Sequence, residues 1–531
     1  MFLQLLATGF LPLSLVLISF FLIKTTSSSK TIKKPSTPIA PTTLPKSYPL
    51  VGQIFSILAN SHRRIQWFSD LLQISPSATI TIHRFFGQRS VVTSNPAVVQ
   101  HMLKSHFHIY QKGDTFRRTI IDFLGNGIFN SDGENWKFQR QVASHEFNTK
   151  SLRNFVENVV DTELSDRLVP ILSIASAQNQ VLDFQDILQR FAFDNICKIA
   201  FGFDPIYLSP SLSQSKFVQA FEDAVKISGD RLATPIPLIW KIKKVLNVGA
   251  EKRIRMAISE IHEFAREIIR EKKHELREKA SLDSVDLLSR FLNSGHSDEV
   301  FVTDIIVSFI LAGRDTTSAA LTWFFWLISK NPRVQSEILK EITENSEATV
   351  YDEVKHMVYT HAALCESMRL YPPVPVDAKE AVSDDVLPEG TVVEKGMRVS
   401  YHVYAMGRSE QLWGPDWAEF KPERWLEKIA ETDKEAAKWN FMGRDPYTYT
   451  VFQAGPRICL GKDMAFLQMK RVVAGVLTRF KVVPVPANGE EPEFVAYLTA
   501  KMKGGFPVRI EKRDERLQTQ LVEKVARFHY P

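Results

Sequence analysis

One cysteine of the chain stands in a setting that suits metal chemistry. Residues 452–461 read FQAGPRICLG, and Cys459 is the cysteine in this stretch. Gly455 and Gly461 let a flat, bulky group approach the backbone, Arg457 supplies a fixed positive charge, and Phe452 can exclude water. Amides close to sulfur, a cation for a porphyrin carboxylate and dry surroundings are what a thiolate ligand of haem iron needs. The alternative is an inert core thiol, which is the usual state of a lone cysteine.

The other cysteines and the charge balance exclude several classes of protein. Cys197 and Cys365 are far from Cys459 in the sequence, and no CxxC pair is present, so neither a disulfide framework nor a zinc or redox pair is predicted. The 66 basic and 60 acidic residues give a net charge of +6 without a long run of one sign, which makes nucleic acid an improbable partner. The chemistry is expected in a reducing compartment.

A second stretch places polar residues inside an apolar helix. Residues 305–330 are mostly apolar, but 312–317 read AGRDTT. Such an interruption can be a simple helix irregularity, because a Thr hydroxyl can hydrogen-bond to a carbonyl one turn earlier. Beside a haem-thiolate loop, a distorted turn leaves room for oxygen, Thr316 can order a proton relay, and Asp315 can supply its protons.

The elements that position these residues are predominantly helical. With 531 residues, 44% hydrophobic and 24% charged, the chain can build a large core. Amphipathic stretches predict helices near 134–147, 182–201, 253–280, 301–330 and 353–371. Alternating residues 79–83 and 90–93, with a turn at Gly87, predict a hairpin in a minor sheet. From residue 50 to 512 neither a repeat nor a second linker interrupts the chain, so one domain is expected.

The two ends of the chain differ from this domain. Residues 2–23 carry no charge, and 16 of these 22 are apolar, which predicts one membrane helix. A cleaved signal peptide is the alternative, but no basic residue precedes Lys24. The lysines that follow predict a cytosolic location for the rest of the chain. Residues 24–49 form a proline-rich linker. Apolar residues at helical spacing in the charged tail 513–531 suggest a short amphipathic helix, but a marginal, frayed appendage is the favoured interpretation.

The cysteine stretch resembles the cytochrome P-450 superfamily, whose pattern FxxGxRxCxG it matches at every fixed position. The resemblance extends over residues 50–512. It implies a mainly helical, single haem-thiolate domain with a small β portion, in which haem b is held by Cys459. Glu366 and Arg369 match the family's ExxR pair, and Arg424 supplies the arginine that completes a buried structural triad.

The resemblance also implies contacts for the haem propionates. Trp136 and Arg140 have the family's WxxxR spacing on one helix face, and a surface Trp/Arg pair is the alternative. Lys379 stands where many relatives have a propionate-binding arginine, and it keeps the charge without the bidentate fork. Ala312 stands where many animal fatty-acid ω-hydroxylases have the glutamate that can form an ester to haem. Haem is therefore expected to be held without a covalent ester.

The activity implied by the resemblance is monooxygenation of a C–H bond with O2. The chain has no flavin or nicotinamide fingerprint, so electrons are expected from a partner, an NADPH-dependent flavoprotein reductase in the endoplasmic reticulum membrane. Lys137, Lys470 and Arg471 are candidate contacts for it, and solvated surface charge is the alternative.

The substrate is expected to be a fatty acid. Residues 44–49, 402–408 and 451–457 resemble the plant fatty-acid ω-hydroxylases, which act on medium- and long-chain acids. The stiff segment Val374-Pro375-Val376 could narrow the approach to iron. The alternatives are ω-oxidation of a jasmonate–amino acid conjugate, isomerisation of fatty-acid hydroperoxides, and a membrane-tethered haem binder. The last two do not need Asp315 and Thr316.

Overall fold

A computed structural model describes residues 43–212, 215–278, 286–293, 298–344, 349–429, 439–486 and 490–513. The predicted membrane segment 2–23, most of the linker and nearly all of the tail lie outside these residues, so the expectations for them stay predictions. No helix in the described ranges is long and apolar enough to cross a membrane.

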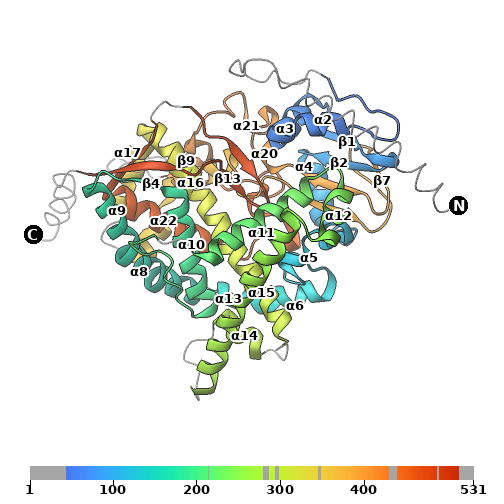
Figure 1. Cartoon of the computed structure of the whole chain (residues 1–531). Coiled ribbons are helices and arrows are strands. Elements are labelled where there is room, and N and C mark those ends of the chain that lie inside the picture. Colours follow the sequence, from blue (N-terminus) through green and yellow to red (C-terminus); the bar gives the residue numbers. More distant parts are fainter. Residues whose placement is uncertain are drawn as a thin grey trace, which may run out of the picture. The chain divides into compact units, whose positions relative to one another are not determined.

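Helices dominate the described chain, as the sequence predicts (Figure 1). They are α2 (Ile54–Ala59), α3 (Arg64–Ile74), α4 (Pro96–Gln100), α5 (Gly113–Leu124), α6 (Gly133–Ser144), α7 (Thr149–Asn154), α8 (Asp161–Glu163), α9 (Val169–Ala177), α10 (Phe184–Phe201), α11 (Lys216–Ala233), α12 (Pro237–Leu246), α13 (Ala250–Glu278), α14 (Leu287–Asn293), α15 (Glu299–Ile310), α16 (Thr316–Lys330), α17 (Pro332–Glu344), α18 (Val350–His356), α19 (Val358–Leu370), α20 (Val403–Met406), α21 (Glu410–Trp413) and α22 (Lys462–Leu477).

Two of the predicted helices are interrupted. The stretch 301–330 forms α15 and α16, joined by a π-helical turn at Leu311–Asp315. The stretch 353–371 falls into α18 and α19, which are separated at Met357 because its ψ of 82° is not helical. A π-turn widens the helix locally, and such turns are frequent at functional sites.

The largest sheet has five strands in the order β1-β2-β8-β5-β3. The predicted hairpin is confirmed: β1 (Thr79–His83) pairs antiparallel with β2 (Arg89–Thr93). The strand β8 (Arg398–Tyr401) runs parallel to β2, and β5 (Asp377–Ala381) and β3 (Tyr110–Gln111) complete the sheet. Figure 1 shows this sheet beside α2, α3 and α4.

The remaining strands form small sheets. They are β4 (Val181–Asp183), β11 (Phe480–Pro484) and β14 (Pro507–Lys512) in one sheet, and the antiparallel pairs β6 (Asp385–Val386) with β7 (Val392–Val393), β9 (Leu426–Lys428) with β10 (Trp439–Phe441), and β12 (Phe494–Ala496) with β13 (Ala500–Met502).

The core is built around α16, which is apolar on nearly every face. It packs against α10 and α19, and Trp323 stacks on Tyr371 with ring centroids 4.0 Å apart. Burying one such large apolar side chain stabilises the fold by about 1.5–3 kcal/mol. A second apolar cluster surrounds α15 and includes Leu311, with Leu460 of the cysteine stretch packed against it. The π-helical turn Leu311–Asp315, called the distal turn below, and the cysteine stretch thus pack against the same core.

Candidate functional site

The cysteine stretch forms a tight loop before α22. The N–H of Cys459 donates to the carbonyl of Phe452 at 2.8 Å, which folds the loop back on itself. Gly455 has a φ of +64°, and a Cβ there would lie 2.0 Å from the carbonyl oxygen of Leu103. Only glycine fits this contact. The side chain of Cys459 is exposed, whereas Cys197 and Cys365 are buried.

Two arginines and a tryptophan gather beside this loop. The guanidinium of Arg457 lies 4.5 Å from the ring centre of Trp136, and that of Arg140 lies 5.8 Å from it. Arg457 donates to Asp132 at 2.6 Å, but its buried Nε has no hydrogen-bond partner in the described part of the chain. Burial lowers the pKa of Arg140, while Cys459 raises it. The loop therefore offers positive charge that the protein only partly neutralises.

The thiol of Cys459 responds to the same surroundings. Burial by the surrounding protein raises its pKa, although the side chain itself reaches open space, and the N–H of Gly461 and the charge of Arg140 act in the opposite direction. A backbone donor and a nearby cation are the groups that favour a thiolate over a thiol.

Lys379 belongs to a group of side chains around the carboxylate of Asp377, and the sequence did not predict this group. Its Nζ is 2.5 Å from Asp377, which also accepts a hydrogen bond from Tyr401 at 2.9 Å and pairs with Lys112 at 3.1 Å. Burial lowers the pKa of Lys379 to about 7. Burial alone would raise the pKa of Asp377, but Lys112 and Lys379 hold it well below its usual range. The positive charge of Lys379 is thus balanced by Asp377. The sequence signal for this pair was the i, i+2 spacing of the two residues in a strand.

The triad residues Glu366, Arg369 and Arg424 lie together in the interior. Arg369 donates twice to Glu366, at 2.8 Å each, and Arg424 donates once at 3.2 Å. Trp425 donates from Nε1 to the same carboxylate at 2.9 Å. One residue before Glu366 in α19, the carbonyl oxygen of Cys365 accepts a hydrogen bond from the hydroxyl of Tyr449 at 3.0 Å. Tyr449 lies shortly before the cysteine loop, so this bond connects α19 to the segment that leads into the loop.

The π-turn presents one face to open space. Ala312, Gly313 and Thr316 are partly accessible, whereas Arg314 and Asp315 are buried. The hydroxyl of Thr316 donates to the carbonyl of Ala312 at 2.6 Å. A Cβ at Gly313 would lie 2.6 Å from the side chain of Ile196 on α10, so the turn packs closely there. The Thr316 oxygen keeps lone pairs that can accept a further hydrogen bond.

Asp315 is held away from that face by a charge network. It accepts from Arg314 at 2.8 Å and from the hydroxyl of Thr499 at 3.3 Å. Arg314 continues to Glu222 of α11 at 2.5 Å, and Glu222 also pairs with Lys501. Burial raises the pKa of Asp315 against the opposing effect of Arg314. Glu222, Thr499 and Lys501 carry no motif, so sequence reasoning missed them.

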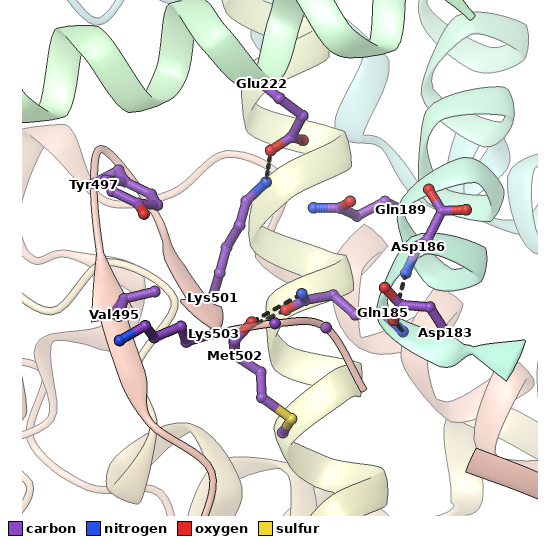
Figure 2. A pocket seen from close by; sticks show the side chains of 12 residues that line it. Asp183, Gln185, Asp186, Gln189, Glu222, Val495, Tyr497, Lys501, Met502 and Lys503 are labelled. Carbon is purple, nitrogen blue, oxygen red and sulfur yellow. Dashed lines mark hydrogen bonds and ion pairs between the residues drawn. The ribbon is translucent and has the colours of Figure 1, made fainter. Parts of the chain in front are cut away.

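A polar pocket of about 420 Å³ lies at the outer end of this network (Figure 2). Glu222, Lys501 and Gln189 line it, and Figure 2 shows the Glu222 carboxylate pointing at the Lys501 ammonium group. The pocket contains none of the site residues that the sequence predicts, and charged groups suit water and ions better than an alkyl chain. It is therefore not where a C–H bond would be oxidised.

The segment with Val374, Pro375 and Val376 is partly buried beside the β12–β13 hairpin. The N–H of Ala500 donates to the carbonyl of Pro373 at 2.8 Å, so the hairpin is tied to this segment. The hairpin also meets α11, where a Cβ on Gly229 would lie 2.6 Å from Tyr497. Its tip thus joins the stiff segment, α11 and the Asp315 network.

Three basic residues are expected from the sequence to meet a reductase, and for Lys470 this expectation is wrong. Lys470 is buried, donates to the carbonyl of Val354 at 2.9 Å and has its pKa lowered by burial to about 8. Lys470 is buried because it lies on the inner face of α22, where it packs toward α18. Arg471 pairs with Asp161 at 2.5 Å, and Lys137 is exposed.

These residues fit a haem group. An accessible thiol at Cys459, the close backbone contact of Gly455 and the Nε of Arg457, which has no partner among the described residues, suit an iron ligand and an anionic propionate. The family model "Cytochrome P450" matches residues 43–504. The chain belongs to the cytochrome P450 family. As a P450 monooxygenase it uses a haem-thiolate cofactor, O2 and electrons from a reductase.

Plant P450s are among its similar relatives. The chain is 65% identical to cytochrome P450 94A1 of Vicia sativa over 89% of this chain and 91% of that protein. It is 63% identical to cytochrome P450 94A2 of Vicia sativa over 93% and 96%. It is 48% identical to cytochrome P450 94B1 of Arabidopsis thaliana over 92% and 94%. These relatives confirm the resemblance to the plant P450 subfamily of fatty-acid ω-hydroxylases that the sequence shows.

Proposed function

We propose that this P450 hydroxylates the terminal, ω carbon of medium- and long-chain fatty acids. The observation that carries the proposal is the pairing of a matched haem-thiolate loop with a distal turn whose accessible face is Ala312, Gly313 and Thr316. The high identity to the plant relatives numbered 94 supports the choice of substrate class.

The chain's own residues supply ligation and proton positioning. Cys459 would hold haem iron through its sulfur, and Arg457, Arg140 and Trp136 would bind the propionates. When bound, haem supplies the iron at which O2 is reduced and one oxygen atom is transferred to a C–H bond. Thr316, whose proton is engaged by Ala312, accepts a hydrogen bond on the open face and orders water there. Asp315 is proposed to feed that water with protons, which requires it to loosen from Arg314.

Selectivity for the chain end is proposed to come from the stiff segment Val374-Pro375-Val376. Pro375 is fixed through its carbonyl, which accepts the N–H of Tyr404 at 3.1 Å, and Val376 packs on the main core. A rigid wall admits a methyl end more easily than a mid-chain methylene, whose approach requires a bent chain.

Electrons are proposed to come from an NADPH-dependent flavoprotein reductase, and the enzyme to lie at the endoplasmic reticulum membrane with its catalytic domain in the cytosol. The apolar segment 2–23 supports this location. So does α12, on which Leu238, Ile239, Ile242, Val245 and Leu246 are exposed between lysines. Such a face suits the surface of a bilayer.

The test is incubation of microsomes that contain the enzyme and its reductase with NADPH and a panel of C10 to C18 fatty acids. Mass spectrometry should find a terminal hydroxyl as the main product. A jasmonate–amino acid conjugate belongs in the same panel, and its exclusive oxidation would replace the fatty-acid proposal. Product formation from fatty-acid hydroperoxides without NADPH would contradict monooxygenation.

A further inference from the structure

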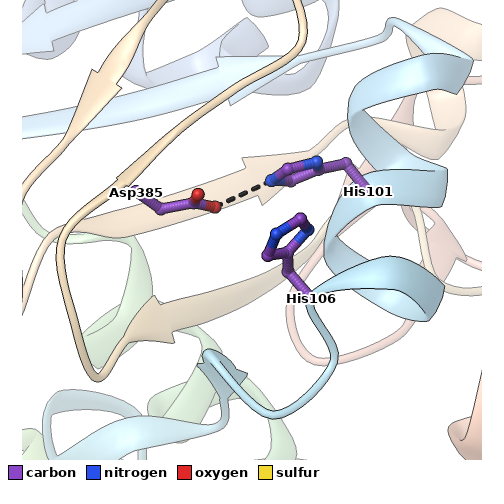
Figure 3. Close-up of side chains that lie close together, drawn as sticks. All are labelled: His101, His106 and Asp385. Atoms are coloured by element: carbon purple, nitrogen blue, oxygen red, sulfur yellow. Dashed lines mark hydrogen bonds and ion pairs between the residues drawn. The ribbon is translucent and has the colours of Figure 1, made fainter.

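A cluster of two histidines and an aspartate lies beside the five-stranded sheet. His101 begins the π-helical turn His101–Ser105, His106 follows that turn, and Asp385 stands in β6. Their ligand atoms lie within 4.8 Å of one another (Figure 3). His101 Nε2 is 2.7 Å from Asp385, and the two imidazole rings stack with centroids 3.9 Å apart.

Polar groups in and near this cluster lack partners. The Nδ1 of His106 is shielded from solvent without a hydrogen bond among the described residues, and so are both carboxylate oxygens of Glu389. Burial raises the pKa of the Tyr110 hydroxyl, and the nearby carboxylates of Asp385 and Glu389 raise it further. Buried imidazole and carboxylate atoms without a partner cost free energy, because they have lost water and gained nothing. A cation bound between His101, His106 and Asp385 would give the His106 imidazole a partner.

We propose that His101, His106 and Asp385 form a binding site for a divalent transition metal of the zinc type, separate from the proposed haem ligands. Two imidazoles and one carboxylate are a common zinc donor set, and the fourth position stays open to water. Tetrahedral zinc holds its ligand atoms about 3.3 Å apart, so the rings must tilt by roughly an ångström from their stacked arrangement.

Neighbouring groups already provide the outer contacts of such a site. The Tyr110 hydroxyl donates to Asp385 Oδ2 at 2.8 Å and would orient the carboxylate toward the ion. Outer partners of this kind fix ligand orientation in metal sites. The lone negative charge of Glu389 adds electrostatic attraction for a cation.

The turn His101–Ser105, which carries one end of the site, contacts the haem loop. Leu103, two residues after His101, presents the carbonyl that meets Gly455. A metal that clamps both ends of this turn would hold that carbonyl in place. Binding to the native state alone stabilises it by mass action, so the metal should also slow the thermal loss of thiolate-bound haem.

The experiment uses the full-length holoenzyme, purified without a polyhistidine tag, equilibrated with Zn2+ and desalted. Elemental mass spectrometry then gives zinc per haem iron, so that iron counts the folded enzyme. Wild type should retain about one zinc per iron. His106→Phe, which keeps a stacked ring, and Asp385→Asn should retain at least about tenfold less. His108→Phe is the matched control, since His108 stacks near His106 but lies outside the cluster.

Two outcomes would overturn the proposal. One is a wild-type enzyme that keeps no zinc, and the other is equal retention by wild type, His106→Phe and Asp385→Asn. The carbon monoxide spectrum of each variant shows independently that the haem-thiolate fold is intact. A melting temperature that rises with Zn2+ in wild type and in His108→Phe, but not in His106→Phe, would support it.

Discussion

Cys459 differs from the other two cysteines in what surrounds it. Cys197 and Cys365 are buried, and burial raises the pKa of both thiols, which keeps them protonated. Only Cys459 combines an accessible side chain with a nearby arginine charge and a backbone donor. The same protein thus holds two thiols as apolar core groups and a third in the setting that the proposed iron ligand needs.

We therefore expect Cys459→Ala to lose the thiolate-type band of the carbon monoxide adduct near 450 nm. Cys365→Ala and Cys197→Ala should keep it, because their side chains only fill space. Difference spectra of the three purified variants decide this. A normal band in Cys459→Ala would remove the residue from the iron.

Thr316 and Thr322 allow a matched comparison along one helix. Both hydroxyls donate to the carbonyl four residues earlier, at 2.6 and 2.7 Å, but Thr316 is partly accessible and Thr322 is fully buried. Thr316→Ala should keep haem and substrate binding, yet release peroxide and consume several NADPH per product, because water on the open face loses its acceptor. Thr322→Ala should stay coupled. Equal coupling in both variants would exclude Thr316 from the proton relay.

At the scale of elements, the buried Glu366 network joins α19 to the turn Pro422–Trp425, which carries Arg424 and Trp425. Glu366→Gln should destabilise the enzyme by about 3–5 kcal/mol, because Arg369 and Arg424 would remain charged in the interior with a weaker partner. Thermal loss of haem measures this. Glu511→Gln, which affects the exposed pair with Lys481, should change stability by about 0–1 kcal/mol. Similar losses in both variants would contradict a structural role for the network.

The helix α15 is connected to the loop after α5 through Asp304. Its carboxylate accepts the N–H of Asn126 at 2.8 Å, and burial raises its pKa to about 6. A folded-state pKa above the ordinary 3.8 means that the native state binds the proton more tightly. Stability is then full below pH 4 and falls by about 3 kcal/mol as pH rises through 6.

Asp304→Asn should remove this dependence. The difference in melting temperature between variant and wild type should grow from pH 4 to 6 in favour of Asn and then level off. Glu299→Gln on the same helix is the control, because Glu299 is exposed. A difference that stays constant with pH would show that Asp304 does not titrate in this range.

The elements also show why sequence reasoning succeeded where it did. Period-3.6 patterns located α6, α10 and α13, and the alternation of 79–83 located β1, since these depend on local burial alone. The distal network could not be found this way. Arg314, Glu222 and Lys501 belong to different elements, and only tertiary packing brings them together. The prediction that Lys470 meets a reductase was wrong for the same reason. Periodicity does not say which neighbouring element covers a helix face.

At the scale of the whole molecule, the haem site and its supports lie in the unit that begins at Thr43. Leu103, whose carbonyl oxygen meets Gly455, and Phe452, whose carbonyl accepts the N–H of Cys459, both lie within this unit. In the sequence, the proline-rich linker separates the expected anchor 2–23 from the domain. Haem binding and membrane attachment should therefore be separable.

Deleting residues 1–24 tests this separation. The truncated enzyme should keep its thiolate-type carbon monoxide spectrum while its partition into phosphatidylcholine vesicles falls, because the expected spanning helix is replaced by interfacial contact alone.

The residual partition should come from α12, on which Ile242 and Val245 are exposed. Adding Ile242→Glu and Val245→Glu to the truncated chain should therefore reduce the partition further. The same pair of substitutions in the full-length enzyme is the control and should leave it in the vesicle fraction. Vesicle flotation and haem spectra measure the two properties on one sample. Loss of haem from soluble, folded truncated protein would contradict the separation, and unchanged partition after truncation would remove residues 2–23 as the anchor.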